Sequence, residues 1–192
     1  MRGAPSATKI FLTGDPGCGK TTVLRRVVEL LRPTVPMTGF LTEEVLKNGR
    51  RRGFCGLTLD GLRFLLAEVG LDTPFRLGPY GVTTEGLESV GVPSLVPGAK
   101  TRLIVLDEVG KMESSSEAFR QSVLTLLDGD TAVLGTVAAH GVGFVKRVRH
   151  DPRITLIRMS REAREGMVGE LLRRLAEFGV GPGTGARRRI SS

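Results

Sequence analysis

Residues 9–31 read KIFLTGDPGCGKTTVLRRVVELL, and this stretch decides the fold. An apolar run at 9–13 is followed by a glycine-rich turn and then by apolar residues at helical spacing, which predicts a strand, a loop and a helix. Pro33 limits the helix, because the residue before a proline is pushed out of the helical region. The loop, GDPGCGKT, satisfies the Walker A pattern GxxxxGK[ST] in the strand, loop and helix context that this motif requires.

Each position of the loop suits the binding of phosphate. Its glycines let the backbone curl, so that successive N–H groups and the helix N-terminus face phosphate oxygens. Lys20 adds a mobile positive charge, and the Thr21 hydroxyl is a hard oxygen ligand for Mg²⁺. We interpret Cys18 as filler rather than a nucleophile, since phosphoryl transfer needs no covalent thiol. The expected phosphate-binding residues are Gly14, Asp15, Pro16, Gly17, Cys18, Gly19, Lys20 and Thr21.

A second apolar run, 102–106, ends in two acids, Asp107 and Glu108. It suits a strand buried on both faces, whose carboxyl end would lie beside the phosphate loop in an open α/β sheet. We expect Asp107 to join Thr21 around Mg²⁺, and Glu108 to deprotonate a water that attacks the γ-phosphate. Taken alone, the acidic pair would more simply end a strand in solvent. The phosphate loop upstream reverses that preference.

Other polar residues are weaker candidates, each with a structural alternative. Lys111 and Glu113 would neutralise developing charge or fix the loop, or else form an exposed salt-bridged turn. Thr136 ends a predicted strand and would approach the γ-phosphate, although a core threonine is the commoner outcome. Glu43 and Glu44 would face the site or lie on a solvated face.

Arginines are numerous, so a solvated surface is the default for each of them. The run at 50–52 lies at a predicted hairpin, where it would contact a phosphate backbone. No interleaved aromatic residues accompany it, so a stacking platform for nucleic acid is not visible. The candidates for a charge-stabilising arginine are Arg147, Arg149 and Arg153.

The remaining pattern predicts an α/β fold with a mainly parallel, three-layer sheet and an added antiparallel meander. Asn48-Gly49 and Asp60-Gly61 mark tight hairpins within a meander over 39–69. Residues 70–98 are expected to form a loop around a short helix at 84–90. Alternating elements follow: a helix opened by a capping box at 114–117, a strand at 131–137, a helix at 142–149, a strand at 154–158, and a helix at 161–178 capped by Ser160.

Length and composition set the wider limits. The chain has 192 residues, which favours one domain, with a core at about 8–178 and a flexible basic tail at 179–192. Two cysteines without zinc-ligand spacing favour a reducing, cytoplasmic location. No apolar run approaches the roughly 18 residues of a membrane-spanning helix. We expect the protein to be a monomer. The net charge of +8 suits a nucleotide or a nucleic acid and does not choose between them.

Five segments together resemble the thermophilic or cancer-related nucleoside-triphosphatase family of P-loop proteins. They are GDPGCGKTT at 14–22, GFLTEEVLKNGRRRGF at 39–54, LIVLDEVGKMES at 103–114, LGT at 134–136 and VKRVRHDPRI at 145–154. The resemblance runs from about Lys9 to about Phe178. It implies a RecA-like sheet with added antiparallel strands, and Mg²⁺-dependent hydrolysis of ATP, GTP and other nucleoside triphosphates with loose base selectivity. The resemblance also implies that Thr22 belongs to the nucleotide loop, that Asp107 and Glu108 are the acidic pair of the family, and that Lys111 is a catalytic lysine.

Three functions compete at this point. A nucleoside-triphosphatase is the first hypothesis, because a free carboxylate beside the γ-phosphate would activate water. A nucleotide or small-molecule kinase would use the same loop, but it needs an acceptor pocket and usually an arginine-rich lid. A nucleic-acid-stimulated ATPase is motivated by the net charge and the arginine run, and ranks well below the first.

Overall fold

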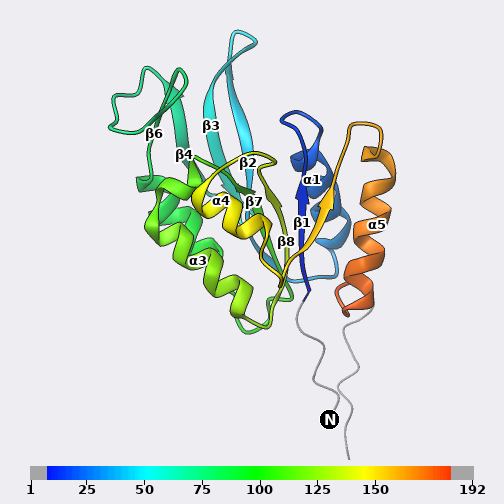
Figure 1. The fold of residues 1–192 in the computed structure, drawn as a ribbon. Coiled ribbons are helices and arrows are strands. Elements are labelled where there is room, and N and C mark those ends of the chain that lie inside the picture. Colours follow the sequence, from blue (N-terminus) through cyan, green and yellow to red (C-terminus); the bar gives the residue numbers. More distant parts are fainter. Residues whose placement is uncertain (1–7, 183–192) are drawn as a thin grey trace, which may run out of the picture.

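A single continuous sheet crosses the computed structural model, which describes residues 8–182. Its strand order is β5-β6-β4-β3-β2-β7-β8-β1-β9 (Figure 1). One half is parallel and contains β2 (Met37–Lys47), β7 (Leu103–Val109), β8 (Ala132–Val137), β1 (Lys9–Thr13) and β9 (Thr155–Arg158). The other half is antiparallel and contains β3 (Arg50–Thr58), β4 (Arg63–Val69), β6 (Tyr80–Val82) and β5 (Arg76–Leu77).

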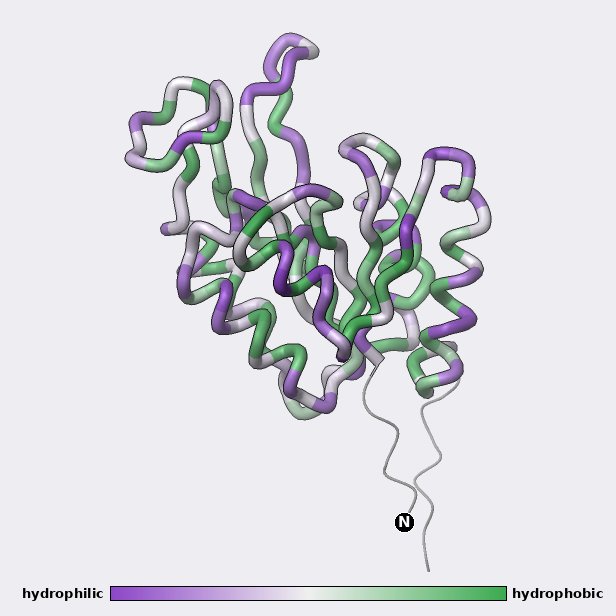
Figure 2. The backbone as a smooth tube through the Cα atoms, in the orientation of Figure 1, coloured by the Kyte–Doolittle hydropathy of each residue, from purple (hydrophilic) through white to green (hydrophobic). Residues whose placement is uncertain are grey.

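Helices cover the two faces of the parallel half, as the predicted three-layer fold requires (Figure 1). One face packs against α1 (Lys20–Leu31) and α5 (Arg164–Glu177), and the other against α3 (Glu117–Asp128) and α4 (Gly143–Arg149). The strands alternate accordingly: Ile10 and Leu12 face α1 and α5, whereas Phe11 belongs to the core beneath α3 and α4. In Figure 2 the strands in the middle of the molecule are largely hydrophobic and the β2–β3 tip is largely hydrophilic.

The meander is part of the main sheet rather than a unit beside it, because β2 belongs to both halves. Residues 37–40 pair in parallel with β7, and residues 40–47 pair antiparallel with β3. The predicted hairpin turns are confirmed at both positions: Asn48 and Gly49 adopt positive φ between β2 and β3, and Gly61 does so between β3 and β4.

Two predicted helix caps are wrong. Ser114 lies in a 3₁₀ turn, Glu113–Ser115, and Ser116 caps α3 instead by accepting the Phe119 N–H at 3.1 Å. Three consecutive serines are equally able to cap, so the sequence could not choose among them. The N-cap of α5 is Ala163 rather than Ser160, and the intervening residues form a turn.

The segment 70–98 contains more structure than the sequence predicted. It supplies the short strands β5 and β6, and then a π-helical stretch, Leu87–Gly91, that continues into α2 (Val92–Ser94). At the other end of the chain, Val180 is buried in the core beside α5, whereas residues 183–192 of the expected tail lie outside the described residues. No helix within 8–182 has the length and hydrophobicity needed to cross a bilayer.

Candidate functional site

The phosphate loop connects β1 to α1 at the carboxyl end of the parallel strands. Gly19 is the N-cap of α1 with a φ of 101°, in the left-handed region that favours glycine. Lys20 and Thr21 therefore begin α1, at the positive end of the helix dipole. Beneath the loop, the Cys18 side chain is buried in the core, in agreement with its interpretation as filler.

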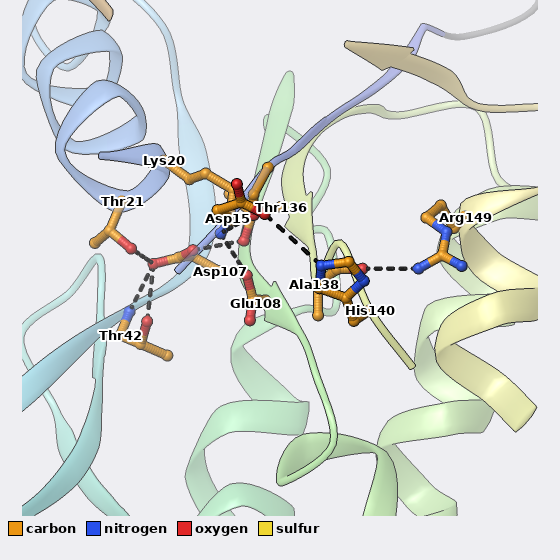
Figure 3. A network of polar contacts seen from close by, with 11 residues as sticks. Asp15, Lys20, Thr21, Thr42, Asp107, Glu108, Thr136, Ala138, His140 and Arg149 are labelled. Carbon is orange, nitrogen blue, oxygen red and sulfur yellow. Dashed lines mark hydrogen bonds and ion pairs between the residues drawn. The ribbon is translucent and has the colours of Figure 1, made fainter. Parts of the chain in front are cut away.

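Lys20 and Glu108 face each other across the site (Figure 3). The Lys20 Nζ donates to the Gly14 carbonyl at 3.0 Å and lies 3.3 Å from the Glu108 Oε1. The lysine side chain is only 10% exposed, so its charge is held within the site rather than in bulk solvent. The loop lysine and the second acid therefore lie at ion-pair distance, as their predicted places at the same end of the sheet require.

Asp107 is the centre of a hydrogen-bond network that joins three strands and a helix (Figure 3). Its Oδ2 accepts from the Thr21 hydroxyl at 2.8 Å, and from the Thr42 hydroxyl at 2.9 Å and N–H at 3.2 Å. Its Oδ1 accepts from the Thr136 hydroxyl at 2.6 Å. With 1% exposure, this carboxylate is held rigidly, and the solvent-facing alternative for the acidic pair does not apply to it.

Burial also sets the chemistry of Glu108. Desolvation raises the pKa of Glu108, Lys20 opposes this rise, and Asp107 adds to it. A carboxylate with a raised pKa is a stronger proton acceptor, while the nearby ammonium favours its ionised form. The Lys20 ammonium thus offsets part of the effect of desolvation on the Glu108 carboxylate.

Glu113 is the most perturbed acid in this region. It is 2% exposed, and burial raises its pKa to about 8, with Glu108 and Asp107 adding to the rise and backbone N–H groups opposing it. The alternative of an exposed salt-bridged turn is therefore wrong for Glu113. Lys111, in the same turn, is exposed and lines a separate cavity of about 480 Å³ together with Arg120 and Arg147.

A cavity of about 770 Å³ contains the site. Asp15 and Cys18 instead line an adjoining cavity of about 670 Å³, formed with the β9–α5 turn. The expected residues that line the site cavity are Pro16, Gly17, Gly19, Lys20, Thr21, Thr22, Asp107 and Glu108.

The antiparallel half supplies the outer wall of this cavity. Glu43 pairs with Arg25 at 3.0 Å, and Glu44 pairs with Arg51 at 2.7 Å. The Arg51 guanidinium also lies 5.2 Å from the centre of the Phe54 ring. Both glutamates thus line the cavity rather than a purely solvated face, and Arg51 of the arginine run is already paired within the protein.

None of the three candidate arginines lines the site cavity. Arg149 donates to the carbonyls of Ala138 and Ala139, and Arg153 pairs with Asp128 and Asp151. Arg147 lies at the cavity of Lys111. The arginines that do line the site cavity are Arg25, Arg51 and Arg164, and the sequence singled out neither Arg25 nor Arg164.

Thr42 was also missed, although its position next to Glu43 could have suggested it. Its role depends on the register of β2, which brings Thr42 two residues beyond the last parallel pair with β7, next to Asp107. Thr136 holds the same carboxylate from β8. Both threonines position Asp107, and neither role is visible in the spacing of the sequence.

The hard oxygens of Thr21 and Asp107 meet at the mouth of the loop and suit Mg²⁺. Within residues 8–182, no three or more His, Cys, Asp or Glu side chains gather to hold a metal ion by themselves.

Comparisons with known proteins identify the family of the chain. A family described as NTPase matches residues 9–172. The chain belongs to this family. It is 36% identical over 165 residues to "Nucleoside-triphosphatase THEP1" of Thermotoga sp. (strain RQ2), covering 85% of this chain and 93% of the relative.

Two further relatives extend the likeness across kingdoms and to a solved fold. The human "Cancer-related nucleoside-triphosphatase" is 36% identical over 181 residues, covering 86% of this chain and 95% of that protein. The crystal structure of THEP1 from Aquifex aeolicus superimposes with a TM-score of 0.79 at 32% identity, over 88% of this chain and 99% of that one. The family membership and the P-loop NTPase fold expected from the sequence are confirmed.

Proposed function

We propose that this protein is a nucleoside-triphosphatase that hydrolyses the β–γ phosphoanhydride of ATP, GTP and other nucleoside triphosphates. The observation that carries the proposal is the convergence of two pairs on one cavity, Lys20 with Glu108 and Thr21 with Asp107. The printed names of the relatives, nucleoside-triphosphatases from Thermotoga and from human, support the same activity.

The chain's own groups divide the work. The loop and Lys20 would bind the phosphates, and a phosphate entering the loop would take over the ammonium now held by Gly14 and Glu108. Glu108 would then lose the partner that lowers its pKa and would become a better acceptor for a proton of the attacking water. The water oxygen forms a bond to the γ-phosphorus, the bridging bond breaks, and the nucleoside diphosphate leaves.

Thr21 and Asp107 would hold Mg²⁺, which supplies charge neutralisation on the phosphates when bound. Thr42 and Thr136 would keep the Asp107 carboxylate in place for this role. Lys111 stays a weaker candidate for a catalytic residue, since it lines a different cavity from the loop lysine.

The test is phosphate release from Mg²⁺-ATP and Mg²⁺-GTP by the purified chain. We expect Glu108→Gln, which keeps size and removes the base, to lower kcat by about 100-fold or more. Lys20→Ala should lower kcat by a similar or larger factor. Glu117→Gln, which changes an exposed acid of α3, is the matched control and should leave turnover unchanged.

Three results would contradict the proposal. Unchanged turnover in Glu108→Gln would remove the assignment of the base, and unchanged turnover in Lys20→Ala would remove the site. Loss of the γ-phosphate to a second substrate, without stoichiometric free phosphate, would make the protein a kinase. Hydrolysis that rises on addition of nucleic acid would favour the nucleic-acid-stimulated alternative.

A further inference from the structure

The site cavity is lined by four cationic side chains, and three of them are already neutralised by acids of the protein. Lys20 pairs with Glu108, Arg25 with Glu43, and Arg51 with Glu44. The fourth is Arg164, and none of the ion pairs between residues 8–182 includes it. A guanidinium at the rim of an anion-binding cavity, without an acid to satisfy it, is available for an anionic ligand.

Arg164 approaches the phosphate loop directly. It is the first residue of α5, after the turn that follows β9. Its Cδ lies 2.7 Å from the point where a Cβ on Gly19 would stand, and its Nη1 lies 3.7 Å from the same point. The missing side chain of Gly19 thus gives the aliphatic part of Arg164 room to cross the loop at the start of α1.

The strand order determines which phosphates Arg164 would meet. β9 flanks β1 on one side, whereas β8 and then β7 lie on the other. Asp107 and Glu108, which would face the reacting γ-phosphate, belong to β7. Arg164 comes from the β9 side, so it reaches the loop from the side opposite to the acids.

We propose that Arg164 is a nucleotide-positioning residue that binds the α- and β-phosphate oxygens, which stay on the nucleoside diphosphate after hydrolysis. This inference rests on the proposed function for the identity of the ligand. A contact of this kind is kept in the substrate and in the product, so it contributes to binding and little to the chemical step. A planar guanidinium fork suits two phosphate oxygens better than a lysine ammonium does.

The experiment combines calorimetry with steady-state kinetics on the full chain. ADP and inorganic pyrophosphate are titrated into native protein, Arg164→Ala and Arg164→Lys, and KM and kcat are measured with Mg²⁺-ATP. We expect Arg164→Ala to weaken the binding of both ADP and pyrophosphate and to raise KM by about 10- to 100-fold. The same variant should change kcat by less than about threefold. Arg164→Lys should lie between the alanine variant and the native protein. Arg173→Ala, which removes an exposed arginine from the same helix, is the control and should bind normally.

Defined results would overturn the inference. If Arg164→Ala binds ADP and pyrophosphate normally, the residue does not hold these phosphates. If the variant binds ADP more weakly but binds pyrophosphate normally, Arg164 contacts the nucleoside and not the phosphates. If kcat falls while ADP binding is unchanged, the contact is with the γ-phosphate. A native protein that binds ADP through Arg164 but releases no phosphate from ATP would refute the proposed hydrolysis and leave this inference standing.

Discussion

The two halves of the sheet border the same cavity and hold their polar groups in opposite ways. In the parallel half, Asp107 is buried and fixed by hydroxyls from α1, β2 and β8. In the antiparallel half, Arg51 and Arg63 reach the glutamates of β2 through ion pairs, with side chains 47% and 63% exposed. Buried hydrogen bonds keep their geometry, whereas exposed ion pairs are screened and weak. The parallel half therefore holds its polar groups in fixed positions, and the antiparallel half closes the wall of the cavity.

The largest expected effect is at Glu113, which follows β7 in the parallel half and is buried like Asp107. The pKa of Glu113 is about 8 in the folded protein and about 4.5 in the unfolded chain. Between these two pH values only the unfolded chain ionises, so the stabilisation that is present below about pH 4.5 is lost as the pH rises to about 8. Glu113→Gln cannot ionise, so the unfolding free energy of this variant minus that of the native protein should rise by roughly 1 kcal/mol per pH unit across this window. Urea unfolding at about pH 5 and about pH 8 measures the rise.

Glu117→Gln is the control for this titration. Hydrogen bonds from Gln121 and Arg120 lower the pKa of Glu117, so its titration lies below the window. Its free-energy difference from the native protein should therefore stay level between the two pH values. A level difference for Glu113→Gln as well would mean that Glu113 is not a buried neutral acid.

Removing one hydroxyl from the Asp107 network should have the next largest effect. Thr136→Val keeps the side-chain shape and leaves the Asp107 Oδ1 without its 2.6 Å donor. We expect a loss of about 1–3 kcal/mol in the unfolding free energy, since an unpartnered buried acceptor keeps its desolvation cost. Phosphate release should fall as well, because the carboxylate is less firmly positioned.

Thr125→Val is the matched substitution on the exposed face of α3, where the hydroxyl bonds to the Gln121 carbonyl. It should change the unfolding free energy by less than about 0.5 kcal/mol. Equal losses of unfolding free energy in Thr136→Val and Thr125→Val would show that the buried network stabilises the protein no more than an exposed hydrogen bond does.

The antiparallel half should give the smallest effect. Arg51→Ala removes the ion pair with Glu44, the hydrogen bond to the Tyr80 hydroxyl and the contact with the Phe54 ring. All three are at the surface, so we expect a loss below about 1 kcal/mol in the unfolding free energy, and kcat within about twofold of native. Arg50→Ala, on the same strand, is the control for loss of charge. A tenfold fall in kcat for Arg51→Ala alone would bring the antiparallel half into the chemistry.

Sequence reasoning succeeded for local features in both halves and failed for roles that depend on contacts between distant segments. Phosphate binding depends on local backbone geometry, so Gly14 to Thr21 carry their own signature in consecutive residues. Both Asn48-Gly49 and Asp60-Gly61 were predictable because a tight turn is also a local property. Thr42, Thr136 and Arg164 were not assigned these roles, because each depends on the pairing of strands that are far apart in the sequence.

The amino-acid sequence by itself determined the strand, loop and helix of the phosphate site, and the alternation that gives a parallel sheet. It also placed the acidic pair next to a buried strand, although β7 extends to Val109 and contains both acids. These follow from torsional preferences and hydrophobic periodicity, which act over a few residues. Only the tertiary structure decided that β2 joins both halves, that Asp107 is held by threonines from two further strands, and that Arg164 crosses Gly19. Those contacts depend on strand order and register, which are set when the whole core packs.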